Sequence, residues 1–334
     1  MEESAATAGA AATAAAAEEV RTLSVKELKA LIARAGLGTQ GCVEKADLIA
    51  RAVEAHELLG QQQQEEQQEQ RVPKQEDASS SGSARTCTTK AEKLGAYECL
   101  LVGHHDVEKL DVVVIVLHGF SAQNTDFVPL ANEMARRMPS RRFMFVLPQA
   151  PVSAASMGAA AWWEIDVMRW LGAMQMGEAG VAKLIRDKPN GLEECRTSMK
   201  EMVKAIEGRF LGDDVPLLIG GFSQGAMTAA DLSWQLVGER RVHGVMMFSG
   251  APIVVDEWHD KLTKAGKDHG LRVLMTHGRA DNVLPFQASG WARDLLANSG
   301  VNVRYETHNG GHELGGPHIL QAIQEFMEET MARS

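Results

Sequence analysis

The chain is poor in cysteine and has no long apolar run. Its four cysteines form neither a CxxC pair nor another paired spacing, which excludes a disulfide framework and is typical of reduced thiols. They are Cys42, Cys87, Cys99 and Cys195. The chain contains no run of about eighteen apolar residues, the length needed to span a bilayer. It also has no glycine-rich phosphate loop before a predicted helix. His104-His105-Asp106 has no further ligand at a typical spacing, so the sequence predicts no metal site.

The chain also has fewer positively than negatively charged residues. The formal net charge of -10 argues against a surface that binds polyanions, so nucleic acid is not an expected partner. The first residues, Met1 to Ser4, are acidic, and the alanines after them are interrupted by threonine and glycine. Neither a secretory signal nor an arginine-rich transit peptide is visible, and we predict a cytoplasmic protein.

Composition divides the chain into four parts. Residues 1–20 are rich in alanine without an amphipathic period and are predicted to be disordered or weakly helical. Residues 21–58 carry two short apolar patterns at helical spacing, which predict a small all-α module. Residues 59–92 are rich in glutamine, glutamate and serine and predict a flexible linker, because such a segment cannot offset the entropy cost of folding. Residues 93–334 have the usual size of one packed α/β domain.

A serine between glycines follows a predicted buried strand. The strand runs from Val215 to Ile219, and the pentapeptide Gly221-Phe222-Ser223-Gln224-Gly225 comes directly after it. Helix formers with an apolar face begin at Ala226. A strand, a tight turn with a serine and a helix together form the nucleophile elbow of a serine hydrolase, in which the glycines leave room for a strained turn. We therefore predict Ser223 as a nucleophile.

The acid and the histidine of such a triad should follow in that order, each after a later strand. Asp281 lies in a loop just past one predicted strand, and His312 lies in a glycine-rich loop just past the next. His308 and His318 are rival histidines, but His308 lies too close to the strand end and His318 follows Pro317 at the start of the last helix. We predict Asp281 as the acid and His312 as the base.

Acyl transfer also needs N–H groups aimed at the developing oxyanion. One is predicted from Gln224, directly after the nucleophile. The second should come from a loop after an earlier strand, and the apolar run Asp111 to Leu117 followed by His118-Gly119-Phe120 is the clear place. We predict the N–H of Phe120 as this donor and a structural role for the His118 side chain.

Strands and helices alternate through residues 93–334. The predicted strands cover residues 97–102, 111–117, 143–147, 215–219, 242–248, 271–275 and 301–305. Apolar residues at helical spacing lie between several of them and again around 319–327, after the last strand. Such alternation predicts an α/β fold with a mostly parallel sheet covered on both faces.

The segment between Pro151 and Asn190 has no clean period. It is rich in methionine and tryptophan, a composition suited to a flexible acyl-binding wall or lid. The same residues could instead plug one edge of the core, and periodicity does not separate the two interpretations. Trp162 and Trp163 in this segment, together with Leu284, are our substrate-binding candidates.

These motifs make the large domain similar to the phospholipase and carboxylesterase group of α/β-hydrolases, which includes acyl-protein thioesterases and lysophospholipases. The matching pieces occur in the family's order and are Leu117-His118-Gly119, Leu147-Pro148-Gln149-Ala150-Pro151, Trp162-Trp163-Glu164-Ile165, Gly221-Phe222-Ser223-Gln224-Gly225, His277-Gly278-Arg279-Ala280-Asp281 with Pro285, and Gly311-His312. The resemblance implies the α/β-hydrolase fold, a triad of Ser223, Asp281 and His312, and a cofactor-free, mostly cytosolic hydrolase of esters or thioesters.

Two positions depart from the family's usual pattern. Gln149 stands where a Pro-His-Ala-Pro segment commonly has its histidine, and Trp163-Glu164 stands where Trp-Tyr-Asp would continue. Neither touches the predicted triad. Both bear on the substrate pocket.

The small module resembles SAP-like helix-extended loop-helix modules, in the variant with a cysteine before the second helix. Gly41-Cys42-Val43-Glu44-Lys45-Ala46-Asp47-Leu48 carries the resemblance. Its positive and negative side chains nearly cancel, so we expect residues 21–58 to bind an unidentified protein rather than DNA.

Three functional hypotheses follow from these patterns. The resemblance and the apolar segment favour an acyl-protein thioesterase or a lysophospholipase-like enzyme acting on S-acylated protein or lysophospholipid. A short-chain carboxylesterase is the alternative within the enzymes. A hypothesis of another class is a non-catalytic scaffold that recruits partners through the small module, and the intact triad motifs argue against it.

Overall fold

The fold was analysed in a computed structural model of the chain. It describes residues 24, 25, 28, 45, 48, 49, 52, 53, 87–152, 156, 158–212 and 215–332. The chain divides into two compact units, residues 1–83 and 84–334, which are considered separately below.

The first unit is described only at eight positions. Seven of them are helical, and they fall where the sequence predicts two helices: Val25, Leu28, Lys45, Leu48, Ile49, Ala52 and Val53. Leu28 and Ala52 are fully buried, as expected for the apolar faces of packed helices. The predicted disordered segment 1–20 and residues 59–86 of the predicted linker lie outside the described residues.

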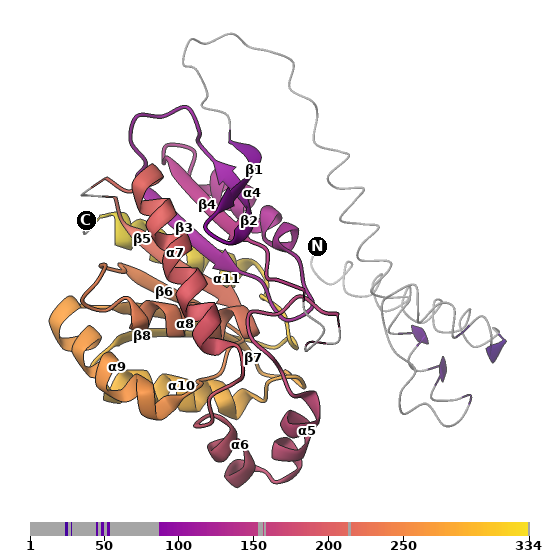
Figure 1. Cartoon of the computed structure of the whole chain (residues 1–334). Helices are drawn as coiled ribbons and strands as arrows, with labels where there is room; N and C mark the ends of the chain where they lie inside the picture. The colour runs from indigo at the N-terminus through magenta and orange to yellow at the C-terminus, as the bar shows by residue number, and fades with distance from the viewer. Residues whose placement is uncertain are drawn as a thin grey trace, which may run out of the picture. The chain divides into compact units, whose positions relative to one another are not determined.

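The second unit is built on one eight-stranded sheet in the order β1-β2-β4-β3-β5-β6-β7-β8 (Figure 1). The strands are β1 (Thr88–Leu94), β2 (Tyr97–Gly103), β3 (Val112–Leu117), β4 (Phe143–Pro148), β5 (Leu217–Phe222), β6 (Gly244–Phe248), β7 (Arg272–Gly278) and β8 (Asn302–His308). The pairs formed by β1 with β2 and by β2 with β4 are antiparallel, and every other pair is parallel. The prediction of a mostly parallel sheet is therefore confirmed.

Helices cover both faces of this sheet. They are α4 (Val128–Arg137), α5 (Val167–Gln175), α6 (Glu178–Leu184), α7 (Leu192–Phe210), α8 (Gln224–Gln235), α9 (Val255–His269), α10 (Phe286–Asn298) and α11 (Pro317–Met331), with a short 3-10 helix η1 (Asn124–Phe127) before α4. Side chains of α4 and α11 pack on one face, and side chains of α7, α8, α9 and α10 pack on the other. No helix in the described part of the chain is both long and apolar enough to cross a membrane.

Alternate residues of each central strand face opposite layers of helices. In β3, Val112, Val114 and Val116 pack with α4 and α11, whereas Val113, Ile115 and Leu117 pack with α7 and α8. A strand buried on both faces needs apolar residues at every position, which is why the central strands read as continuous apolar runs in the sequence.

The predicted start of the large domain at residue 93 is too late. Strand β1 begins at Thr88 and pairs with β2 along its whole length, so residues 88–92 belong to the sheet and not to the linker. The strand lies at the edge of the sheet and most of its residues are exposed. An exposed edge strand of threonine, lysine and glutamate has no apolar alternation, so its sequence gives no strand signal.

The segment without a clean period contains two short helices, α5 and α6, which lie together at the foot of Figure 1. Val181 and Ile185, in and just after α6, pack against Val255 at the start of α9. The N–H of Val255 donates a hydrogen bond to the Ile185 carbonyl at 3.1 Å. Helix α6 is thus anchored on the domain, while Met168 and Met176, in α5 and just beyond it, are 77% and 71% exposed.

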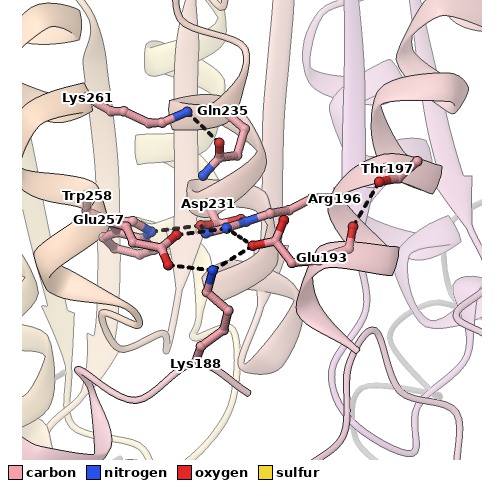
Figure 2. A network of polar contacts seen from close by, with 9 residues as sticks. All are labelled: Lys188, Glu193, Arg196, Thr197, Asp231, Gln235, Glu257, Trp258 and Lys261. Atoms are coloured by element: carbon pink, nitrogen blue, oxygen red, sulfur yellow. Dashed lines mark hydrogen bonds and ion pairs between the residues drawn. The ribbon is translucent and has the colours of Figure 1, made fainter. Parts of the chain in front are cut away.

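A buried polar network ties α7, α8 and α9 together (Figure 2). Arg196 of α7 donates two hydrogen bonds of 2.7 Å to the two carboxylate oxygens of Asp231 in α8. Its remaining Nη1 contacts Glu193 and Glu257, and the indole N–H of Trp258 donates to Asp231 at 2.9 Å. Arg196 and Asp231 are 8% and 1% exposed. This network holds the helix that follows Ser223.

We expect Asp231→Ala to lower the free energy of unfolding by about 3–5 kcal/mol, because it leaves the Arg196 guanidinium buried without its main partner. Urea unfolding at neutral pH measures the loss. The exposed pair Arg293 and Asp294 offers a control, and Asp294→Ala should change the free energy of unfolding by less than about 0.5 kcal/mol. Equal effects of Asp231→Ala and Asp294→Ala would contradict the role assigned to the network.

Candidate active site

Ser223 lies at the carboxyl end of β5, between the strand and α8. Its backbone has φ 56° and ψ -121°, a conformation that residues with a side chain rarely adopt. Neighbouring elements hold it there: the Ser223 N–H donates to the Phe248 carbonyl at 2.9 Å, and the Ser223 carbonyl accepts from the N–H groups of Ala226 and Met227. The strained strand-to-helix turn expected of a nucleophile elbow is present.

The two glycines of the pentapeptide are required by close contact between backbones. A Cβ on Gly221 would overlap the backbone of Gly225, and a Cβ on Gly225 would overlap the carbonyl oxygens of Leu117 and His118. The start of α8 therefore rests directly on the end of β3. Parallel pairing of β3 with β5, which sets Leu117 opposite Gly221, brings these segments to the same edge of the sheet.

Asp281 and His312 meet at this same edge. Asp281 follows β7 and His312 follows β8, and the two strands pair in parallel. His312 Nδ1 lies 2.7 Å from Asp281 Oδ2, so the imidazole donates a hydrogen bond to the carboxylate. The His312 ring also contacts the ring of Phe222, the residue before Ser223, with centroids 4.8 Å apart. The structure thus brings the predicted acid to the predicted base, and the base to the elbow.

The rival histidines do not contact the acid through any described hydrogen bond. His308, at the end of β8, is buried, and its Nδ1 lies 3.9 Å from a carboxylate oxygen of Glu313. The Nε2 of His318 lies 3.1 Å from the Thr307 carbonyl on the surface of the domain. These positions favour His312 over both alternatives.

A second histidine, His277, lies behind the acid and was not a sequence candidate. It is fully buried at the end of β7. Its Nε2 lies 2.8 Å from the Leu284 carbonyl and 3.3 Å from Asp281 Oδ2. The carbonyl can only accept, so Nε2 carries the proton and also faces the carboxylate. The motif His277-Gly278-Arg279-Ala280-Asp281 contains this histidine, but the sequence pattern alone gives it no role.

The Asp281 loop folds around its own carboxylate. Asp281 Oδ1 accepts hydrogen bonds from the N–H groups of Val283 and Leu284 at 2.9 and 2.8 Å. Burial raises the pKa of the Asp281 carboxyl, but the hydrogen bonds from His312 and from these two N–H groups outweigh it and lower the pKa below its usual value. Asp281 is therefore ionised at neutral pH. Leu284, a predicted substrate contact, is buried and supports the acid.

The two predicted oxyanion donors flank Ser223. Gln224 is the first residue of α8, and the N–H groups of the first helical turn have no partner inside a helix. The Gly119-Phe120 turn lies on the other side: a Cβ on Gly119 would be 3.4 Å from the Cβ of Ser223. No acceptor among the described residues takes the N–H of Phe120.

Trp162 and Trp163, the other predicted substrate contacts, are fixed to the elbow by hydrogen bonds. The Gln224 side chain accepts from the Trp162 N–H at 3.2 Å and donates to the Trp163 carbonyl at 2.8 Å. The indole of Trp162 donates to the His118 carbonyl, and that of Trp163 donates to Thr228. Trp162 is only 3% exposed and packs in the core, so its placement favours the core interpretation at this position.

We expect Gly225→Ala to lower the free energy of unfolding by about 2–3 kcal/mol, since the new methyl group would overlap two carbonyl oxygens of β3 and its turn. Gly290→Ala is the matched control, because nothing lies within 4 Å of a Cβ at this position in α10. It should instead raise the stability by about 0.5–1 kcal/mol, as alanine is the better helix former. Thermal unfolding of the two variants measures both changes in stability. Similar stabilities would refute the close contact.

The lowered pKa of Asp281 predicts a pH dependence of stability. A carboxyl whose folded-state pKa lies below its unfolded value of 3.8 stabilises the fold fully above that value, and it loses the contribution as the pH falls through the folded-state pKa. The stability advantage of the wild type over Asp281→Asn should therefore be constant above about pH 5 and shrink below about pH 4. Urea unfolding of both proteins across this range tests it, and a constant difference down to low pH would disprove it.

Comparisons with known proteins match the large domain along nearly its whole length. A family model described as Phospholipase/Carboxylesterase matches residues 104–331. Acyl-protein thioesterase 1 of Neurospora crassa is 24% identical over 228 residues, which cover 68% of this chain and 90% of that protein. A probable carboxylesterase of Oryza sativa is 25% identical over 211 residues, covering 60% of this chain and 71% of that protein.

Solved structures share the fold. The crystal structure of Zea mays acyl-protein thioesterase 2 aligns with a TM-score of 0.53 at 18% identity, covering 74% of this chain and all of that one. A carboxylesterase from Mesorhizobium loti aligns with a TM-score of 0.52 at 17% identity, covering 72% of this chain and 98% of that one. The predicted α/β-hydrolase fold is thereby confirmed.

The first unit matches a different domain from the one expected. Residues 14–68 match a model described as an E3 ubiquitin-protein ligase rififylin-like domain. The prediction of a SAP-like module at residues 21–58 is not confirmed by this match, because an apolar pattern of two short helices is shared by many small helical modules. The expected protein partner of this segment stays a prediction, as does the cytoplasmic location.

The matching family model covers more than half of the chain, and the fold and the nucleophile-elbow turn agree with it. The chain belongs to the phospholipase/carboxylesterase family of α/β-hydrolases and is a hydrolase of that family.

Proposed function

We propose that the chain hydrolyses carboxylic esters or thioesters with Ser223 as nucleophile, His312 as general base and Asp281 as the acid that orients it. The observation that carries the proposal is the 2.7 Å hydrogen bond between His312 Nδ1 and Asp281 Oδ2, placed at the sheet edge where Ser223 sits in its strained turn. The carboxylate fixes the tautomer in which Nε2 of His312 is free to accept a proton.

The mechanism has two acyl-transfer steps. Ser223 Oγ attacks the carbonyl carbon while His312 Nε2 takes the hydroxyl proton, and the resulting imidazolium is stabilised by the Asp281 carboxylate. The oxyanion of the tetrahedral intermediate is held by the N–H groups of Phe120 and Gln224. The C–O or C–S bond then breaks, and His312 returns the proton to the leaving alcohol or thiol. Water, activated by His312 in the same way, releases the acid and regenerates Ser223.

Exposed apolar side chains favour a substrate with a long acyl chain. Four large apolar side chains are exposed among the described residues from 87 onward, namely Val152, Met168, Met176 and Val283. All four lie on segments that leave the carboxyl ends of β4 and β7, the edge that holds Ser223. Exposed apolar side chains suit a lipid-like substrate, and methionine adapts to flexible chains. We therefore propose acyl-protein thioesterase or lysophospholipase-like activity, in keeping with the name of the Neurospora crassa relative.

The short-chain carboxylesterase is retained as the second candidate, because the relative from Oryza sativa is named a probable carboxylesterase. A non-catalytic scaffold is not retained, since the family is one of hydrolases and the elbow is intact.

Ser223→Ala should lower hydrolysis by about four to six orders of magnitude, because every later step needs the Oγ atom. Labelling with a fluorophosphonate probe, which reports an activated serine, should disappear in the same variant. Ser299→Ala is the control: this buried serine only donates to the Leu295 carbonyl in α10, and its loss should leave labelling intact. Full hydrolysis by Ser223→Ala with an unchanged melting temperature would reject the proposal.

The substrate class is tested by p-nitrophenyl esters of increasing chain length and a palmitoyl thioester, each with wild type and Ser223→Ala. Serine-dependent activity that rises toward long chains or the thioester supports the thioesterase or lysophospholipase assignment. Activity confined to acetate and butyrate would support the short-chain carboxylesterase instead.

A further inference from the structure

The imidazole of His118 is held in one tautomer by three hydrogen bonds. Its Nδ1 lies 2.7 Å from the Gly119 carbonyl, which can only accept, so Nδ1 carries the proton. Its Nε2 therefore accepts, and it takes the Ala150 N–H at 3.0 Å and a Gln149 side-chain N–H at 3.1 Å. Burial lowers the pKa of His118, which keeps the ring neutral. The ring is fully buried and is 5.0 Å from the Trp162 ring.

Gln149 helps to fix the orientation of the His118 ring through Nε2, the ring nitrogen that does not contact Gly119. Its amide oxygen accepts the Asn124 N–H at 3.0 Å, so the amide nitrogen is the atom that faces His118. Because oxygen and nitrogen of the amide each have a partner of the right kind, the side chain has one orientation. This is the position where the family commonly has a histidine.

Two hydrogen bonds to the Gly119 carbonyl set the direction of the Gly119-Phe120 peptide group: a short one of 2.7 Å from His118 Nδ1 and a longer one of 3.3 Å from the Ala122 N–H. In a trans peptide the C=O and N–H point to opposite sides of the chain. Strand β3 lies between β4 and β5 in the sheet. The Gly119 carbonyl is held on the side of β4, where Gln149 and Ala150 follow the last residue of that strand. The Phe120 N–H is therefore directed to the side of β5, where Ser223 lies.

We infer that His118 and Gln149 are positioning residues that preset the Phe120 N–H as an oxyanion donor. The inference rests on the proposed function of Ser223. Without the short bond to His118, the longer bond from the Ala122 N–H remains on the Gly119 carbonyl. The Gly119-Phe120 peptide is then freer to rotate and present its carbonyl oxygen to the oxyanion, which would repel it. The donor is thus ready before substrate binds, and the His118 ring itself never touches substrate.

Two amide variants of His118 separate this role from simple packing. The amide nitrogen of His118→Asn can take the place of Nδ1 and still donate to the Gly119 carbonyl, whereas that of His118→Gln falls near Nε2 and cannot. We expect kcat of His118→Asn to stay within about threefold of wild type. His118→Gln should lose about a hundredfold in kcat with KM nearly unchanged, the effect of losing one oxyanion donor. Steady-state hydrolysis of a p-nitrophenyl ester measures both.

A double-mutant cycle combines His118→Gln with a variant that lacks the Phe120 N–H. Phe120→Pro has no N–H to aim, so adding His118→Gln to it should cost little more in kcat. Independent, additive losses would overturn the inference, and so would equal losses in His118→Asn and His118→Gln, which indicate a packing role only. The melting temperature of each variant shows that it is folded.

Gln149→Leu gives a test that does not disturb the buried ring. Gln149 is only partly buried, and the Ala150 N–H still holds His118 Nε2 in this variant, so we expect a smaller loss of about tenfold in kcat. The control is Asn124→Ala, which keeps the main-chain N–H used by Gln149 and should match wild type. Wild-type kcat in both Gln149→Leu and His118→Gln would overturn the inference. A wild-type protein that neither labels nor hydrolyses any ester would instead reject the proposed function.

Discussion

The close contact between the start of α8 and the end of β3 is the constraint on which the site depends. Gly225 lies so near the carbonyl oxygens of Leu117 and His118 that no Cβ fits between them. This contact places the turn of Ser223 and the turn of Gly119 side by side, because β3 and β5 are neighbours in the parallel sheet. A nucleophile and the donors for its oxyanion have to lie within a few ångströms of each other. The backbone contact holds the proposed nucleophile and the proposed donors close together.

Other parts of the fold oppose movement of that contact. On the far side of α8, the Arg196 and Asp231 pair joins the helix to α7, and Trp258 joins it to α9 (Figure 2). Near the elbow, the Gln224 side chain clamps the backbone of Trp162 and Trp163. The strain in the Ser223 turn costs roughly 1–3 kcal/mol and persists only if its surroundings outweigh it. Buried polar pairs are suited to this purpose, because they fix orientation as well as distance.

Much of this could be predicted from the sequence. Continuous apolar strands located the central sheet, and the order of Ser223, Asp281 and His312 along the chain picked out three residues that the fold brings to one edge. The rest depends on contacts that no local pattern records. A buried histidine at a strand end looks like any core residue, so the sequence gives His277 no role. Aromatic composition is the same for pocket and core, so the sequence does not separate the two interpretations of Trp162. Strand β1 was missed because both of its faces are polar, and the partners of Asp231 lie 35 and 27 residues away from it.

The departure at Gln149 also makes physical sense once its neighbours are known. The position needs one group that donates to His118 Nε2 and one that accepts from the Asn124 N–H. A primary amide supplies both and carries no charge at any pH, so its contact with His118 does not titrate. An imidazole at the same place would offer one donor and one acceptor only while neutral, and its protonation would remove the acceptor. Glutamine at position 149 therefore preserves the geometry of the Gly119-Phe120 peptide. This geometry then does not depend on the protonation state of a second imidazole.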